Sequence, residues 1–172
     1  MKSTEVYSLL KSEIGPWLKA EGFKRAGSLL SWCRPSGDSY TVLWFQVSRD
    51  GWDAYAGSRF AVEFQRSAEP LVGAKSSARG RIASFLSASE REDVRAIQNS
   101  IVAEFQTPPK THPPLNITPE ISEWYLSNFK IATEPYPDRD DIWFHYSKPE
   151  HVRTWSRFIL SKLPDCIAAI EA

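Results

Sequence analysis

The chain has 172 residues, and folding a chain of this length buries about 70% of the surface that it exposes when unfolded. Its composition, 42% apolar and 24% charged, is that of a globular protein and argues against a disordered chain. The formal net charge is zero, so the chain lacks the positive field with which nucleic-acid-binding proteins attract phosphates. We therefore expect one domain over residues 1–172 that binds no nucleic acid.

The N-terminal residues 1–5 are polar and lead into an amphipathic segment, and no later apolar run is long enough to span a bilayer. This pattern predicts a cytoplasmic protein that does not associate with membranes. The two cysteines, Cys33 and Cys166, lie far apart in apolar segments, which favours buried, reduced thiols over a disulfide.

The first predicted element is an amphipathic helix that begins near Thr4, a candidate N-cap, and stops at Gly22. Its apolar residues follow the helical period at Tyr7, Leu10, Ile14, Trp17 and Leu18. Gly15 and Pro16 fall inside this segment. Because proline removes a backbone hydrogen bond and crowds the preceding turn, we expect a kink or a break there.

Alternating apolar residues then predict strands at 29–34 and 39–48, which a turn at 35–38 joins into a hairpin. The second strand is apolar on both faces, which is typical of a central strand. A third strand at 59–65 alternates cleanly and predicts a sheet with one polar face: Phe60, Val62 and Phe64 lie on one side, and Arg59, Ala61, Glu63 and Gln65 lie on the other.

Residues 69–80 contain one proline and two glycines among small and basic residues, which predicts a mobile loop. Ser89 and Glu92 have the spacing of a capping box and predict the start of a second helix, which four prolines end by residue 114. A short helix is expected from Thr118 to Phe129.

Residues 142–146 alternate again and predict a strand that joins the existing sheet. Ser147 and Glu150 have the spacing of another capping box, and a final helix with a long apolar stripe follows, with a kink expected at Pro164. Strands cluster first and helices mostly follow. This order predicts an α+β fold, an antiparallel sheet of about four strands with helices packed mainly on one face.

Three segments together resemble a bacterial domain-of-unknown-function family, DUF four-three-zero-four: Leu18 to Arg25, Trp44 to Ser48 and Phe60 to Phe64. In that family a helix ending in a Gly-Phe-Lys turn leads into a hairpin that ends in Gln-x-Ser. The match covers the first third of the chain best, and the segments 141–144 and 152–155 are similar to longer members. The resemblance implies a small bacterial domain without an established activity.

Motifs with a known chemistry fail at specific positions. Gly73-Ala74-Lys75-Ser76 resembles a phosphate-binding loop but lacks its glycines, although nearby arginines could still hold an anion. Asp138, Asp140 and Asp141 are not followed by the remaining residues of a calcium loop. His112, His145 and His151 lack zinc spacing, and no Gly-x-Ser-x-Gly elbow is present. We predict no metal, no cofactor and no catalytic residue.

The segment from Arg49 to Gly57 is unusual for a loop, because it carries Trp52 and Tyr55 among charged residues and glycines. Rings that fold back would close one end of the core. Rings that point outward would flank the polar face of Glu63 and Gln65 and form a groove. Such a mix of groups is typical of recognition surfaces. The candidate binding residues are Arg49, Asp50, Trp52, Asp53, Tyr55, Glu63 and Gln65.

The sequence favours a noncatalytic module that binds an unidentified protein or small ligand in this groove, as a monomer or a homodimer. One version is a bacterial immunity-type or regulatory protein that masks a partner. The alternative is a small hydrolase that uses Asp50, Asp53 or Glu63 as acid and base, since paired carboxylates do such work when their pKa values differ.

Overall fold

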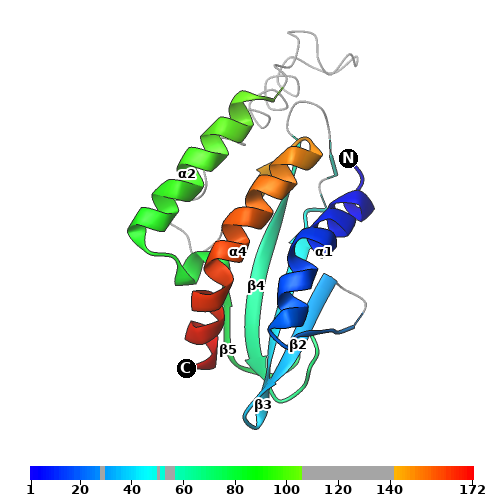
Figure 1. The fold of residues 1–172 in the computed structure, drawn as a ribbon, viewed down its shortest axis with the longest axis vertical. Coiled ribbons are helices and arrows are strands. Elements are labelled where there is room, and N and C mark those ends of the chain that lie inside the picture. Colours follow the sequence, from blue (N-terminus) through cyan, green and yellow to red (C-terminus); the bar gives the residue numbers. More distant parts are fainter. Residues whose placement is uncertain (28–29, 50, 53–56, 106–141) are drawn as a thin grey trace, which may run out of the picture.

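The computed structural model describes residues 1–27, 30–49, 51–52, 57–105 and 142–172. Within them the chain forms three α-helices, one 3-10 helix and six strands (Figure 1). In chain order these are α1 (Ser3–Ala20), β1 (Lys24–Arg25), β2 (Leu30–Ser36), β3 (Ser39–Val47), β4 (Ser58–Ser67), β5 (Ser76–Arg81), η1 (Ile82–Phe85), α2 (Ala88–Ala103), β6 (Phe144–Tyr146) and α4 (Pro149–Glu171).

The strands form one antiparallel sheet in the order β1-β2-β3-β4-β5, and β6 pairs with β4. β3 pairs with one edge of β4, and two strands share the other edge. There, β6 pairs with Ser58–Phe60 and β5 pairs with Glu63–Ser67. The predicted α+β class, the hairpin and the central position of β3 are confirmed. The final strand does join the sheet, as the sequence predicted.

The sheet described here has six strands rather than the predicted four, because β1 and β5 gave no periodic signal. β1 has two residues, which is too short to show alternation. β5 has the sequence SSARGR and overlaps the predicted mobile loop at residues 69–80, so that prediction is wrong for residues 76–80. Its pairing with β4, and not an apolar face of its own, makes it a strand.

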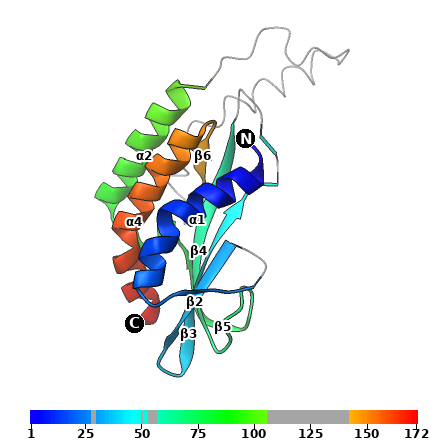
Figure 2. The same ribbon diagram turned by 45° about the vertical axis from the view of Figure 1, so that its right-hand side comes forward.

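Helices α1 and α4 lie side by side on one face of the sheet, with α2 next to α4 (Figures 1 and 2). The predicted apolar stripes face the sheet. The fully buried residues include Leu10, Ile14 and Leu18 of α1, Phe60, Val62 and Phe64 of β4, and Trp155, Ile159 and Leu163 of α4. An ion pair between Lys162 Nζ and Glu90 Oε1, 2.8 Å apart, joins α4 to α2.

The helices begin at positions other than those predicted. α1 begins after Lys2, not Thr4, and the backbone N–H of Lys2 donates to the Glu5 carboxylate. α2 uses Ser87 and Glu90 as its capping box, two residues before the predicted pair. Both pairs have the same spacing in the sequence, so spacing alone could not distinguish them. Lys148, not Ser147, is the N-cap of α4, and Pro149 occupies the first turn.

Neither α1 nor α4 breaks at its internal proline. α1 continues through Pro16 and α4 continues through Pro164. The apolar residues on both sides of each proline are buried in the core, among them Ile14 and Leu18 in α1. Burial of these stripes offsets the hydrogen bond that each proline removes.

Side chains from two helices close the outer edge of β6. The backbone N–H of His145 donates to Gln98 Oε1, 3.4 Å away, and the indole N–H of Trp155 donates to the His145 carbonyl at 2.8 Å. These are the backbone groups with which a further strand would pair. The sheet is therefore blocked from extending at this edge.

No helix within the described ranges is both long and apolar enough to cross a membrane. The predicted helix from Thr118 to Phe129, together with His112 and the three aspartates at 138–141, lies outside the described residues.

Candidate functional site

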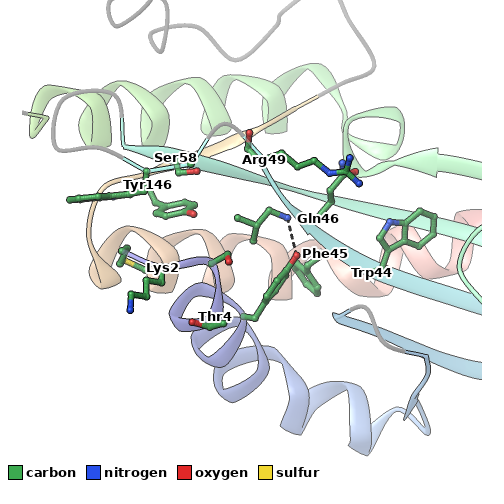
Figure 3. A pocket seen from close by; sticks show the side chains of 15 residues that line it. Lys2, Thr4, Trp44, Phe45, Gln46, Arg49, Ser58 and Tyr146 are labelled. Carbon is green, nitrogen blue, oxygen red and sulfur yellow. Dashed lines mark hydrogen bonds between the residues drawn. The ribbon is translucent and has the colours of Figure 1, made fainter. Parts of the chain in front are cut away.

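A pocket of about 950 Å³ lies where the N-terminus of α1 meets the end of β3 (Figure 3). Ligand sites in proteins are commonly clefts of about 300–1,000 Å³, so this volume suits a small molecule. The described residues that line the pocket are Met1, Lys2, Ser3, Thr4, Tyr7, Trp44, Phe45, Gln46, Val47, Ser48, Arg49, Gly51, Trp52, Ser58 and Tyr146.

Trp52 borders this pocket and is 41% exposed. Its indole N–H donates to the carbonyl of Ser147, 3.2 Å away, at the turn between β6 and α4. The hydrogen bond ties one edge of the ring to the protein while much of the ring stays accessible. Trp52 therefore does not fill the core, and it offers an apolar surface at a pocket, a combination typical of recognition sites.

The pocket continues past the point at which β2 stops pairing with β3. The last pair in that register joins Leu30 and Phe45, while β3 pairs with β4 as far as Val47. The backbone N–H of Val47, which has no strand partner among the described residues on the β2 side, donates to the hydroxyl of Tyr7 at 3.4 Å (Figure 3). Tyr7 thus both lines the pocket and satisfies the free edge of β3.

Tyr146 forms part of the wall and comes from β6. Its ring is 1% exposed, and its side chain hydrogen-bonds to Ser58, which lies opposite it in the strand register. Burial raises the pKa of the Tyr146 hydroxyl further above neutral pH.

The cationic side chains on the described wall are those of Lys2 and Arg49, and none of the described lining residues carries a carboxylate. Lys2 comes from the N-cap of α1, and Arg49 comes from the segment after β3. Figure 3 shows the two side chains at opposite ends of the pocket. The pocket therefore combines aromatic walls with positive charge.

Of the predicted binding residues, Arg49 and Trp52 meet at this pocket, and Glu63 does not line it. Glu63 lies on the sheet face away from α1 and α4, where Arg79 contacts it at 2.5 Å and Arg81 at 3.8 Å. Glu63 is 8% exposed, so it is a buried partner of two guanidinium groups. Its interpretation as an acid or a base stays a prediction.

Gln65 has an internal role. Its amide nitrogen donates to Ser67 Oγ and to the Leu71 carbonyl, and its amide oxygen accepts from the Gly73 N–H. Gln65 is fully buried, and these bonds hold the turn between β4 and β5. The polar pattern of β4 therefore reflects buried hydrogen-bonding groups at both Glu63 and Gln65, and not a solvated face.

Asp50, Asp53 and Tyr55 lie outside the described residues, and their assignment to the site stays a prediction. The sequence did not indicate the contribution of α1 or β6, namely Lys2, Thr4, Tyr7 and Tyr146. These residues are far from Trp52 in the chain, and only the packing of the N-terminus against the end of β3 brings them together.

A second polar cluster lies beside the pocket, at the start of α4. His151 Nδ1 is 3.3 Å from Ser147 Oγ, and His151 Nε2 is 3.3 Å from Glu104 Oε2. The three side chains thus follow one another as serine, histidine and carboxylate, which is the order of a catalytic triad. The backbone N–H of Ser147 also donates to Nδ1, at 3.2 Å. Nδ1 has one lone pair, and the backbone N–H of Ser147 already donates to it at the start of the helix. Nδ1 is therefore poorly placed to accept a proton from the Ser147 hydroxyl.

Burial and the Glu104 carboxylate have opposing effects on His151. Burial lowers the pKa of His151 and dominates, while the hydrogen bond with Glu104 raises it. Lys148 forms an ion pair with the same carboxylate, and hydrogen bonds from Lys148 and His151 lower the pKa of Glu104. His151 is thus neutral at pH 7, and the cluster joins the start of α4 to the end of α2.

His145 lies on the same sheet face as Arg59, its partner in β4. It is 7% exposed, and its Nδ1 atom has no hydrogen-bond partner within the described structure. Burial first, and repulsion by Arg59 second, lower the pKa of His145 to about 4. An imidazole in this environment is neutral at physiological pH.

The described residues contain no group of three or more His, Cys, Asp or Glu side chains that could hold a metal ion. Both cysteines are free thiols; Cys33 is half-buried and Cys166 is buried.

No protein-family model, curated protein sequence or solved structure matches this chain. The resemblance to DUF four-three-zero-four therefore stays a prediction, and the site geometry alone supports the functional proposal below.

Proposed function

We propose that this protein is a noncatalytic binding module whose ligand, or a side chain of whose partner, enters the pocket between the N-terminus of α1 and Trp52. The observation that supports this most is the position of Trp52. Of the large apolar residues in the described ranges, only Trp52 and Leu71 are strongly exposed, and Trp52 lines the pocket.

The geometry also supports binding over catalysis. The described wall offers rings, hydroxyls and cationic groups but no carboxylate and no histidine. The buried carboxylate of Glu63 and the histidine of the Ser147–His151 contact both serve internal partners. A wall of this kind can hold a molecule in one orientation, whereas proton transfer needs a group that can give or take a proton at the operating pH.

The test is to fill the pocket without disturbing the core. Thr4 lines the pocket and its side chain is exposed on α1, so Thr4→Trp should occupy the pocket while the fold is retained. Ser8→Trp adds the same ring to an exposed position of the same helix outside the lining residues, and it is the matched control.

The probe is N-phenyl-1-naphthylamine, an uncharged dye that fluoresces in apolar surroundings. We expect the native protein to bind it, Thr4→Trp to weaken binding about tenfold or more, which corresponds to about 1.4 kcal/mol, and Ser8→Trp to leave it unchanged. Urea midpoints that match among the three proteins would show that the dye does not report a loosened core. Equal binding by Thr4→Trp and the native protein would contradict the proposal.

A further inference from the structure

The charges of the pocket point to the class of its ligand. Resting on the proposed function, we infer that the pocket takes a small organic anion, a molecule with an apolar ring or chain and a carboxylate or similar negatively charged group. The apolar body would lie against the rings of Tyr7, Trp52 and Tyr146, and the anionic group would approach Lys2 or Arg49.

The first argument is the charge balance of the wall. The whole chain has equal numbers of acidic and basic residues, 21 of each, yet the described lining residues include Lys2 and Arg49 and no acidic side chain. A cleft lined by one sign of charge concentrates ions of the opposite sign. The described wall of the pocket is thus biased towards anions although the protein as a whole is neutral.

The second argument is that Lys2 and Arg49 have no ion-pair partner among the described residues. Several cationic side chains elsewhere are already paired, including Arg34 with Glu171, Arg79 with Glu63 and Lys162 with Glu90. Neither Lys2 nor Arg49 forms an ion pair with any residue in the described part of the chain. Within the described residues, no carboxylate therefore competes with a ligand for either cation.

The third argument concerns what the remaining wall offers an anion. The side chains of Ser3 and Thr4 line the pocket, and their hydroxyl groups can donate hydrogen bonds to a carboxylate. Ser3 and Thr4 also lie in the first turn of α1, an 18-residue helix, where the helix dipole favours negative charge. These groups add to the side-chain charges of Lys2 and Arg49.

The free edge of β3 does not favour an extended peptide as the occupant. A peptide that adds a strand needs backbone donors and acceptors along the edge. Among the described residues, only the last residues of β3 extend beyond β2, and the N–H of Val47 is already bonded to the Tyr7 hydroxyl. A small molecule fits the pocket without breaking this bond.

The experiment compares two dyes with similar ring systems and different charge. 8-Anilinonaphthalene-1-sulfonate carries a negative charge, and N-phenyl-1-naphthylamine is its uncharged counterpart. Binding of each is titrated by fluorescence to the native protein, to Lys2→Gln, to Arg49→Gln and to the double variant. Lys19→Gln is the control, since Lys19 is an exposed cation at the other end of α1.

Because Lys2 and Arg49 lie at opposite ends of the pocket, we expect one of the two single variants, at the cation that the sulfonate approaches, to weaken sulfonate binding about threefold to fivefold, and the double variant to weaken it at least as much. Binding of the uncharged dye should change less than about twofold, which is below half a kcal/mol. Raising the salt concentration should weaken binding of the sulfonate alone, because ions screen the attraction.

The outcomes separate this inference from the proposed function. If the double variant binds both dyes like the native protein while Thr4→Trp still blocks the uncharged dye, the anion assignment is overturned and the binding pocket stands. If Thr4→Trp blocks neither dye, the dyes bind elsewhere and both proposals fail.

Discussion

Acid should destabilise this protein through one buried histidine. His145 is nearly inaccessible, its Nδ1 atom lacks a partner among the described residues, and its pKa falls from 6.5 to about 4 because of burial and of Arg59. Between these two pH values the unfolded chain binds a proton at His145 and the folded protein does not. The free energy of unfolding is therefore undiminished above about pH 6.5 and falls as the pH drops towards about 4.

The size of the effect follows from the pKa difference. One pKa unit corresponds to about 1.36 kcal/mol, so a shift of this size corresponds to about 3 kcal/mol in total, of which about 2 kcal/mol is lost between pH 7 and pH 5. That is a large part of the stability of a typical domain, about 5–15 kcal/mol.

The assay is urea unfolding followed by tryptophan fluorescence at several pH values, with His145→Gln as the comparison. Glutamine does not titrate, so the variant should lose about 2 kcal/mol less than the native protein between pH 7 and pH 5. The pKa of His151 is also lowered, but His151 is present in both proteins and its contribution cancels. The same pH dependence in both proteins would show that His145 titrates normally in the folded state and would refute the reasoning.

Two further predictions concern a glycine and the cysteines. Gly57→Ala should cost roughly 2–4 kcal/mol of unfolding free energy, because Gly57 has φ +62° and a Cβ atom there would lie 2.2 Å from the carbonyl oxygen of Tyr146. Gly73→Ala should cost only about 1 kcal/mol, since Gly73 also has a positive φ but open space around it; equal losses in urea unfolding would contradict the clash. Burial raises the pKa of Cys166 to about 12, so 5,5′-dithiobis(2-nitrobenzoic acid) at pH 8 should modify Cys33 in the native protein and Cys166 only after unfolding. Mass spectrometry that finds both thiols labelled at equal rates before unfolding would be evidence against this burial.

The sequence predicted the elements that carry their own apolar period. The stripe of α4 and the alternation of β4 are local patterns, and each records which face of its element meets the core. β5 has no such pattern, because it is an edge strand defined by its hydrogen bonds with β4. The start of α2 was ambiguous because two serine–glutamate pairs have identical spacing.

The candidate site was predictable only in part. Arg49 and Trp52 stood out as unusual residues in a loop, and the structure places both at one pocket. Glu63 and Gln65 share a strand face, but their alternation could not reveal that Arg79 and the turn at Leu71 and Gly73 would cover them.

By itself, the sequence determined the fold class and the core stripes, because hydrophobic period and turn residues act within a few positions of the chain. The tertiary structure alone decided the rest. It brings the N-terminus of α1 against the end of β3 to form the pocket, it buries His145, and it leaves Lys2 and Arg49 without ion-pair partners in the described part of the chain. These properties depend on which segments, distant in the sequence, come into contact. Such contacts produce no periodic pattern in the sequence.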